Sequence, residues 1–225
     1  MREYVSGLFL ILDSKKYTDD IAFRGISPFE GQQTIVVKGG NRETSRRGKA
    51  LDLGNTIKAK LYKRHHYYLT EAEIVESFSF IKSDLVTIVL FQILLAVLKH
   101  TYFLPERSFF FSLYQSLLEL NEAKDVERAQ LGIFLLIMKV LSFYDVVSFP
   151  FTCNICGVHT YQGNFDYLGY YCNDHKAKEG TDFSLFSNED RVAYLSLILK
   201  DQLNITLSRH PFPKHHAPSV EKRSN

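Results

Sequence analysis

The pattern of apolar and polar positions changes once along the chain, near Ser77. Before this point, short stretches rich in β-branched and aromatic residues are separated by turn residues such as Ser27-Pro28 and Gly39-Gly40-Asn41. Short runs of this kind, bounded by turn signals, are typical of strands. The predicted strands cover residues 5–12, 20–24, 34–38, 53–62 and 68–76. Five short strands within residues 1–76 favour a small barrel of the OB type.

After Ser77 the apolar residues recur with the spacing of α-helices. Between Leu85 and Lys99 they nearly encircle the segment, which predicts a central buried helix. Further helices are expected at 106–120, at 123–147 before Pro150, and at 187–203, where a sequence resembling a capping box opens the last one. The prediction is therefore an α+β fold, in which an OB-fold β-barrel is followed by an all-α domain.

The predicted domains are 1–76 for the barrel and 77–208 for the helical domain, with residues 209–225 as a disordered tail that contains three prolines. The chain has 225 residues, of which 45% are hydrophobic and 23% charged, and a net charge of +2. This composition excludes a largely disordered chain and a histone-like polycation. The longest apolar run, 85–98, is too short to cross a bilayer of roughly 30 Å. Because the N-terminus also lacks the features of a signal peptide, we expect a cytoplasmic protein.

All three cysteines fall close together, in the pattern Cys153-x-x-Cys156 followed by Cys172-x-x-His175. Two such pairs, joined by a loop, have the spacing of a tetrahedral zinc site, because each pair can hold one side of the ion. The alternative is a set of unrelated buried cysteines with a surface histidine, and His159 is a competing ligand that would break the paired geometry. Four protein ligands leave no position for water, so we expect one structural Zn²⁺ in a small insertion at 153–175.

The excess of Lys and Arg over Asp and Glu is concentrated between positions 38 and 64, where only Glu43 and Asp52 oppose the cations. Along 56–62 the alternation predicts that Lys58, Lys60 and Tyr62 share the outer face of a strand. Two cations beside an aromatic ring suit a phosphate backbone and a stacked base. The alternative is a solvated strand protected by lysines. The preceding loop adds a flexible cationic arm, formed by Arg42, Arg46, Arg47 and Lys49.

Motifs for catalysis are missing from the sequence: it contains no P-loop, GxSxG, HExxH or GxGxxG. The adjacent Asp19 and Asp20 would point to opposite faces of a strand, so we expect a local structural role rather than shared metal chemistry. We therefore expect a protein that is not an enzyme. A metal-dependent hydrolase remains a minor alternative, disfavoured by the closed zinc site.

Several short segments, taken in order, carry a likeness to a known family. They are KYTDDI at 16–21, VVKGG at 36–40 with SRR at 45–47, LGN at 53–55, LTEAE at 69–73, the CxxCG at 153–157 and the last helix at 195–203. With the order of barrel, helices and zinc site, they resemble the RecO family of bacterial recombination mediators, up to about Leu207. His175 stands where that family usually has a fourth cysteine, and Asp52-Leu53 replaces the proline that is common before Gly-Asn.

The resemblance implies a non-catalytic DNA repair protein of the bacterial cytoplasm, associated with the nucleoid. Members of the family bind single- and double-stranded DNA, anneal complementary strands, contact the acidic C-terminal tail of single-strand-binding protein and, with RecR, help RecA to load. The DNA contacts that it implies here are Lys38, Arg42, Arg46, Arg47, Lys49, Lys58 and Lys60. The alternative function is a protein-interaction scaffold with a structural zinc, which would show no salt-sensitive affinity for DNA.

Overall fold

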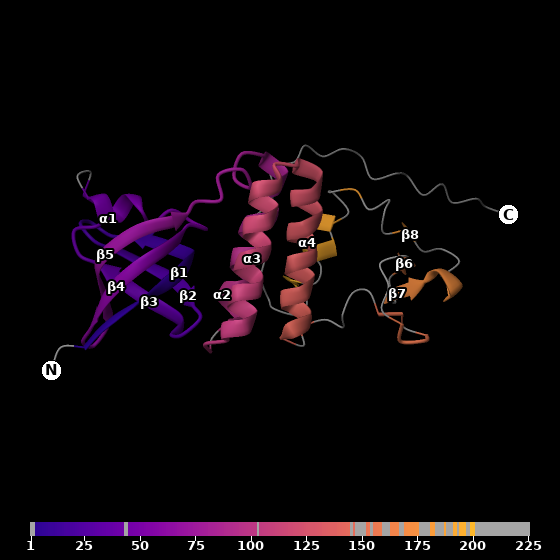
Figure 1. The fold of residues 1–225 in the computed structure, drawn as a ribbon, viewed down its shortest axis with the longest axis horizontal. Coiled ribbons are helices and arrows are strands. Elements are labelled where there is room, and N and C mark those ends of the chain that lie inside the picture. Colours follow the sequence, from indigo (N-terminus) through magenta and orange to yellow (C-terminus); the bar gives the residue numbers. More distant parts are fainter. Residues whose placement is uncertain are drawn as a thin grey trace.

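The computed structural model consists of a barrel of strands, a set of helices and a small second sheet, which follow one another along the chain (Figure 1). No helix in the described part of the chain is both long and apolar enough to cross a bilayer. The structure describes residues 3–42, 45–102, 104–144, 146, 152–153, 155–158, 163–166, 169–175, 181–182, 187, 191–192, 194–196 and 199–200. The predicted tail, 209–225, lies outside these residues.

Five strands form the first part, as the sequence predicted. Their bounds are β1 (Glu3–Lys16), β2 (Ile21–Ser27), β3 (Gly31–Val37), β4 (Thr56–Lys63) and β5 (Tyr67–Glu76). β1 pairs antiparallel with both β2 and β4, whereas β3 pairs parallel with β5. The strands thus close into a barrel in the order β1-β2-β3-β5-β4.

Alternation of side chains along β4 shows why this segment forms a barrel wall. Ile57, Ala59 and Leu61 are buried inside, whereas Lys58 and Lys60 are exposed outside. Successive side chains of a strand point to opposite faces, so this sequence supplies one face to the core and one to solvent. The inward residues of all five strands make one hydrophobic cluster, to which the loop before β4 adds Ala50 and Leu51.

The middle of β1 is buried on both faces. Phe9 and Ile11 belong to the cluster inside the barrel, whereas Leu10 and Leu12 belong to a second cluster formed mainly by the helices. This explains the continuous apolar run of the sequence at this point, since neither face meets water. β1 therefore joins the barrel to the helices.

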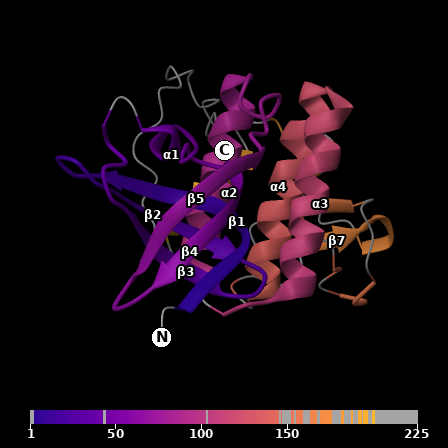
Figure 2. The same cartoon turned by 60° about the vertical axis from the view of Figure 1, so that its left-hand side comes forward.

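The helices begin with a short turn, α1 (Arg46–Lys49), and continue as α2 (Leu85–Thr101), α3 (Arg107–Ala123) and α4 (Val126–Phe143). α2 is buried around most of its circumference, as predicted, and Figure 2 shows it between the barrel and the α3–α4 pair. α4 is shorter than the expected 123–147. Lys124 takes a left-handed conformation with φ 50° that ends α3, and Asp125 caps α4 by accepting from the N–H of Arg128 at 3.1 Å.

Polar contacts add to the apolar junction between barrel and helices. Lys99 on α2 forms an ion pair with Asp13 on β1 at 2.6 Å. The Nζ of Lys82 donates to the side-chain oxygen of Asn55 at 2.8 Å, and burial lowers the pKa of this amine. Gly54, with φ +74°, lies so close to α2 that an added Cβ would be 2.3 Å from the ring of Phe91. Both the positive φ of Gly54 and the ring of Phe91 thus disfavour any side chain at position 54.

The last described segments form a small sheet and part of a further helix. The sheet has the order β7-β6-β8, from β6 (Gly163–Asp166), β7 (Gly169–Cys172) and β8 (Thr181–Asp182), and a 3₁₀ turn, η1 (Asn173–His175), follows β7. Residues 191–192, 194–196 and 199–200 are helical, within the helix predicted at 187–203. Val192, Leu195 and Leu199 are buried in the cluster of the helices.

Candidate functional site

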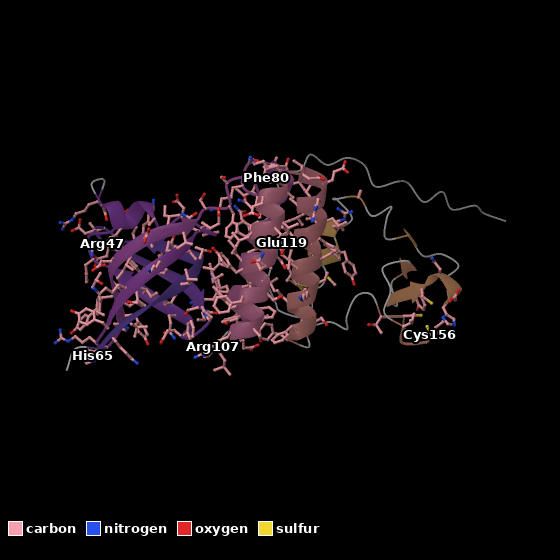
Figure 3. The ribbon with its side chains drawn as sticks, in the orientation of Figure 1. Arg47, His65, Phe80, Arg107, Glu119 and Cys156 are labelled. Atoms are coloured by element: carbon pink, nitrogen blue, oxygen red, sulfur yellow. The ribbon has the colours of Figure 1, made fainter. Side chains whose placement is uncertain are left out.

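The four predicted metal ligands come together in the structure. The Sγ atoms of Cys153, Cys156 and Cys172 and a ring nitrogen of His175 all lie within 4.8 Å of one another. Cys172 ends β7 and His175 ends η1, which presents these two residues to the turn that carries the first pair. Figure 3 shows Cys156 on this small module, far along the molecule from the barrel.

Distances between the ligand atoms fit a tetrahedral ion. Zn–S bonds of about 2.3 Å and Zn–N bonds of about 2.0 Å place neighbouring sulfurs about 3.8 Å apart and sulfur and nitrogen about 3.5 Å apart. The Sγ atoms of Cys156 and Cys172 are 3.8 Å apart. The Nδ1 of His175 lies 3.7 Å from the Sγ of Cys153 and 3.3 Å from that of Cys172. The group can therefore hold a metal ion, and it is compatible with one zinc.

Backbone hydrogen bonds shape the turn of the first cysteine pair. The N–H of Gly157 donates to the carbonyl of Cys153 at 2.9 Å, and the N–H of Cys153 donates to the carbonyl of Val158 at 3.0 Å. Gly157 has φ +70°, a conformation that favours glycine. This turn places the exposed Cys156 opposite the buried Cys153 and Cys172. His159, the competing ligand considered from the sequence, lies outside the described residues.

The thiols themselves differ in how readily they ionise. Burial raises the pKa of Cys153, but the backbone amides of Cys156, Cys172 and Ile155 donate to its sulfur, and the net pKa is lowered to about 6. The amide of Val158 acts on Cys156 in the lowering direction, yet desolvation and the neighbouring sulfurs of Cys153 and Cys172 outweigh it, and its pKa is raised. Cys153 therefore ionises readily, whereas a second thiolate beside it, at Cys156, would be stabilised by a bound cation.

The outer face of β4 was the second predicted site, and its side chains lie in rows that run across the barrel. One row joins Leu8, Lys58 and Glu73, and the next joins Ser6, Lys60 and Glu71, each on β1, β4 and β5 in turn. The Nζ of Lys60 lies 3.2 Å from the carboxylate of Glu71. Both lysines line an open hollow of about 320 Å³, which the two glutamates also border. The two predicted lysines share a face, as expected, but each has a carboxylate on the adjacent strand.

Two further predicted cations are engaged with the aspartates of the β1–β2 turn. The Nζ of Lys38 lies 2.6 Å from one carboxylate oxygen of Asp20, and the other oxygen accepts from the N–H of Gly39. Both interactions lower the pKa of Asp20. Arg42 contacts Asp19 at 3.5 Å. The aspartate pair thus has the local role expected from the sequence, and it offsets part of the charge that we assigned to DNA binding.

The expected cationic arm is partly folded against the barrel. Ser45 caps the α1 turn by accepting from the N–H of Gly48, and the guanidinium of Arg47 donates to the carbonyls of Lys38 and Leu69 at 3.1 and 3.2 Å. Arg47 therefore holds the loop to β3 and β5 instead of extending from a flexible arm. Figure 3 shows it beside the barrel. Arg46 and Lys49 are the other two predicted DNA contacts of this segment, and the structure does not describe their side chains.

A third row on the same face consists of three tyrosines, two of which the sequence reasoning missed. Tyr4, Tyr62 and Tyr68 lie opposite one another on β1, β4 and β5. The ring centroids are 5.6 Å apart for Tyr4 and Tyr62, and 6.4 Å apart for Tyr62 and Tyr68. Only Tyr62 was predicted to face outward with the lysines. The same alternation of side chains predicts which face Tyr4 and Tyr68 occupy on β1 and β5. It does not predict that these two tyrosines lie beside Tyr62, because that depends on how the three strands pair.

No protein-family model matches the chain, and no curated protein matches it in sequence.

Proposed function

We propose that this chain is a DNA-binding recombination mediator of the RecO type, which acts without catalysing a covalent step. The observation that carries the proposal is the strand order β1-β2-β3-β5-β4, with β3 parallel to β5, followed by a helical bundle and then a Cys3His group. A closed five-stranded barrel of this order supports the OB type, whose strand faces bind single-stranded nucleic acid. The same parts, in the same order, underlie the resemblance to the RecO family.

The proposed DNA contact is the outer face of β4 with its flanking strands. Annealing requires two polyanions to be neutralised and held close together, which a cationic face can do without a catalytic residue. Lys58 and Lys60 are both exposed on this face beside Tyr62. Lys38 and Arg42, which follow β3, remain more than half exposed in their ion pairs. Lys60, Lys38 and Arg42 are thus proposed as DNA contacts although each is partly neutralised by a carboxylate.

The metal group is proposed to hold one structural Zn²⁺. Cys153, Cys156, Cys172 and His175 would be its ligands, and their number leaves no open position for a substrate. In this role the ion would replace hydrophobic burial as the stabiliser of a module built from very short strands. The donor set of three sulfurs and one nitrogen is one that zinc prefers.

The proposed partners follow from the family resemblance alone. They are single- and double-stranded DNA, RecR, the acidic tail of single-strand-binding protein and, functionally, RecA. The setting would be the bacterial cytoplasm, at the nucleoid. Mediators of this kind would bring complementary strands together on DNA that single-strand-binding protein covers.

A protein-interaction scaffold is the second candidate, and one observation favours it. Glu71 and Glu73 lie opposite Lys60 and Lys58 across the β4–β5 pair, so this part of the face has no excess positive charge. Lysines on a strand are also a common protection against unwanted pairing between sheets. A scaffold of this kind would bind no DNA even at low salt.

The test is binding of labelled single-stranded DNA across a salt series, with strand annealing followed in the same samples. A recombination mediator should show log affinity that falls linearly with log salt, together with faster annealing. Lys58→Glu with Lys60→Glu should abolish annealing and leave the fold intact. The matched control reverses two exposed cations at the α3–α4 turn, Lys124→Glu with Arg128→Glu, and should anneal normally. Absence of binding at low salt would favour the scaffold instead.

A further inference from the structure

The row of Tyr4, Tyr62 and Tyr68 crosses three strands of the barrel on its outer face. Tyr62 follows Lys58 and Lys60 on the exposed side of β4, and the pairing of β4 with β1 and β5 brings the other two tyrosines beside it. Tyr4 is 52% exposed, although it is a large aromatic side chain. Tyr62 and Tyr68 are half-buried, so each still presents part of its ring to solvent. A partly exposed aromatic row therefore lies directly next to the rows that contain the lysines.

The distance between neighbouring tyrosine rings is larger than the distance between stacked bases of a duplex. The centroids are 5.6 and 6.4 Å apart, whereas successive bases of a duplex strand rise by about 3.4 Å. Bases that each contact one of these rings would therefore be pulled apart from one another. In a duplex the base faces are covered by their neighbours, and only base edges and phosphates reach a protein surface. A single strand, by contrast, offers base faces that stack on aromatic side chains.

Cations lie close to both ends of the row. The Nζ of Lys60 is 6.0 Å from the ring centroid of Tyr4. At the other end, Tyr68 lies opposite Val36 on β3, and Lys38 follows two residues later, in an ion pair with Asp20. A strand whose bases follow the row would have a cation near its phosphates at each end. The rings themselves add no negative charge, unlike the rows that contain Glu71 and Glu73.

We propose that Tyr4, Tyr62 and Tyr68 form a stacking surface that makes the barrel face select single-stranded over double-stranded nucleic acid. The inference rests on the proposed DNA-binding function and deepens it, because the lysines alone would attract either form. Base stacking on each ring supplies the preference, and the lysines supply attraction to phosphates.

The alternative to a stacking surface is a purely structural role, in which the tyrosines only stabilise the sheet. Cross-strand aromatic pairs do so by modest amounts. A purely structural row would affect thermal unfolding and would change the affinity for every form of DNA equally. Selective loss of one form distinguishes the two roles.

The experiment compares three probes on the full chain: an oligothymidylate, an abasic oligomer of the same length and a duplex. Tyr4→Ala and Tyr62→Ala should each weaken binding of the oligothymidylate about fivefold or more and leave the other two probes unchanged. Tyr62→Phe should retain the affinity of the unmodified chain, since it keeps the ring. The control is Tyr17→Ala, at an equally exposed tyrosine in the β1–β2 turn, which should leave all three affinities unchanged.

A second readout does not depend on the stability of the alanine variants. The chain contains no tryptophan, so Tyr62→Trp introduces a single indole whose fluorescence should be quenched by the oligothymidylate but not by the abasic oligomer. Equal quenching by both, or tyrosine variants with unchanged affinity for single strands, would overturn the stacking surface and leave DNA binding in place. A chain that binds none of the probes at low salt would overturn the proposed function, and this inference with it.

Discussion

Removing negative charge from the barrel face should tighten its hold on DNA. Glu71 and Glu73 on β5 lie opposite Lys60 and Lys58 on β4, and Glu71 is in contact with Lys60. If phosphates bind these lysines, the two carboxylates repel them and compete for the same amines. The double change Glu71→Gln with Glu73→Gln keeps the size of both side chains and removes this opposition.

The magnitude follows from the geometry of the sheet. Neighbouring strands are about 4.8 Å apart, so a phosphate on either lysine lies about that far from a carboxylate. Two like charges at this distance repel by about 0.9 kcal/mol in water. Screening with a Debye length of about 8 Å reduces this to roughly half at physiological salt. The double variant should therefore bind single strands about fivefold more tightly, with a larger gain at low salt.

The assay is fluorescence anisotropy of a labelled single strand at several salt concentrations. The control, Glu119→Gln with Glu122→Gln, removes the same charge from exposed positions on α3, away from the barrel face. It separates the local effect from the general change in net charge. If the β5 variant gains no more affinity than the α3 variant, the lysine row of β4 does not contact the phosphates.

Three further changes test the zinc module, the junction and the start of α2. Cys172→Ser should lower the zinc content well below one per chain and expose residues 152–175 to proteolysis. The thermal unfolding of α2–α4 should stay unchanged, because the ligands lie outside both hydrophobic clusters. Gly54→Ala should cost about 1–3 kcal/mol in urea unfolding, since its Cβ would overlap Phe91, whereas Gly7→Ala, with only ordinary contacts, should cost much less. Hydrogen bonds, foremost from the N–H of Thr87, lower the pKa of Asp84. The stability that the ionised carboxylate of Asp84 adds to the fold should be complete above its pKa in the unfolded chain, about 3.9. It should be lost as the pH falls through the lower pKa of the folded state. Asp84→Ala should cost about 1 kcal/mol at neutral pH and flatten acid unfolding monitored by circular dichroism.

Local patterns in the sequence were sufficient to predict elements whose structure depends on near neighbours. The alternation of β4 predicted which side of the strand Lys58 and Lys60 occupy, and the buried circumference of α2 followed from its continuous apolar sequence. The Cys-x-x-Cys and Cys-x-x-His pairs likewise predicted a cluster, because each pair needs only a tight turn to present two ligands. In these cases the spacing along the chain determines the geometry.

Features that depend on pairing between distant segments could not be predicted in the same way. The row of Tyr4, Tyr62 and Tyr68 requires the registers of two strand pairs, one of which shifts between Lys60 and Leu61. The role of Arg47 also depends on the carbonyl groups of Lys38, directly after β3, and of Leu69 on β5. A count of cations along the sequence treats such an arginine as available for DNA, although its guanidinium is already bonded to the main chain.

The double burial of β1 raises the question of what fixes its alignment. In most strands, a slip of one residue would turn apolar side chains toward water, and this cost holds the strand in place. A slip among Phe9, Leu10, Ile11 and Leu12 would only exchange one apolar set for another. Within this run, the alignment is therefore supported by directional contacts at its end: the main-chain bonds of Ile11 to Gly54 and Asn55, and the ion pair of Asp13 with Lys99. Polar groups thus help to position the most apolar part of the barrel.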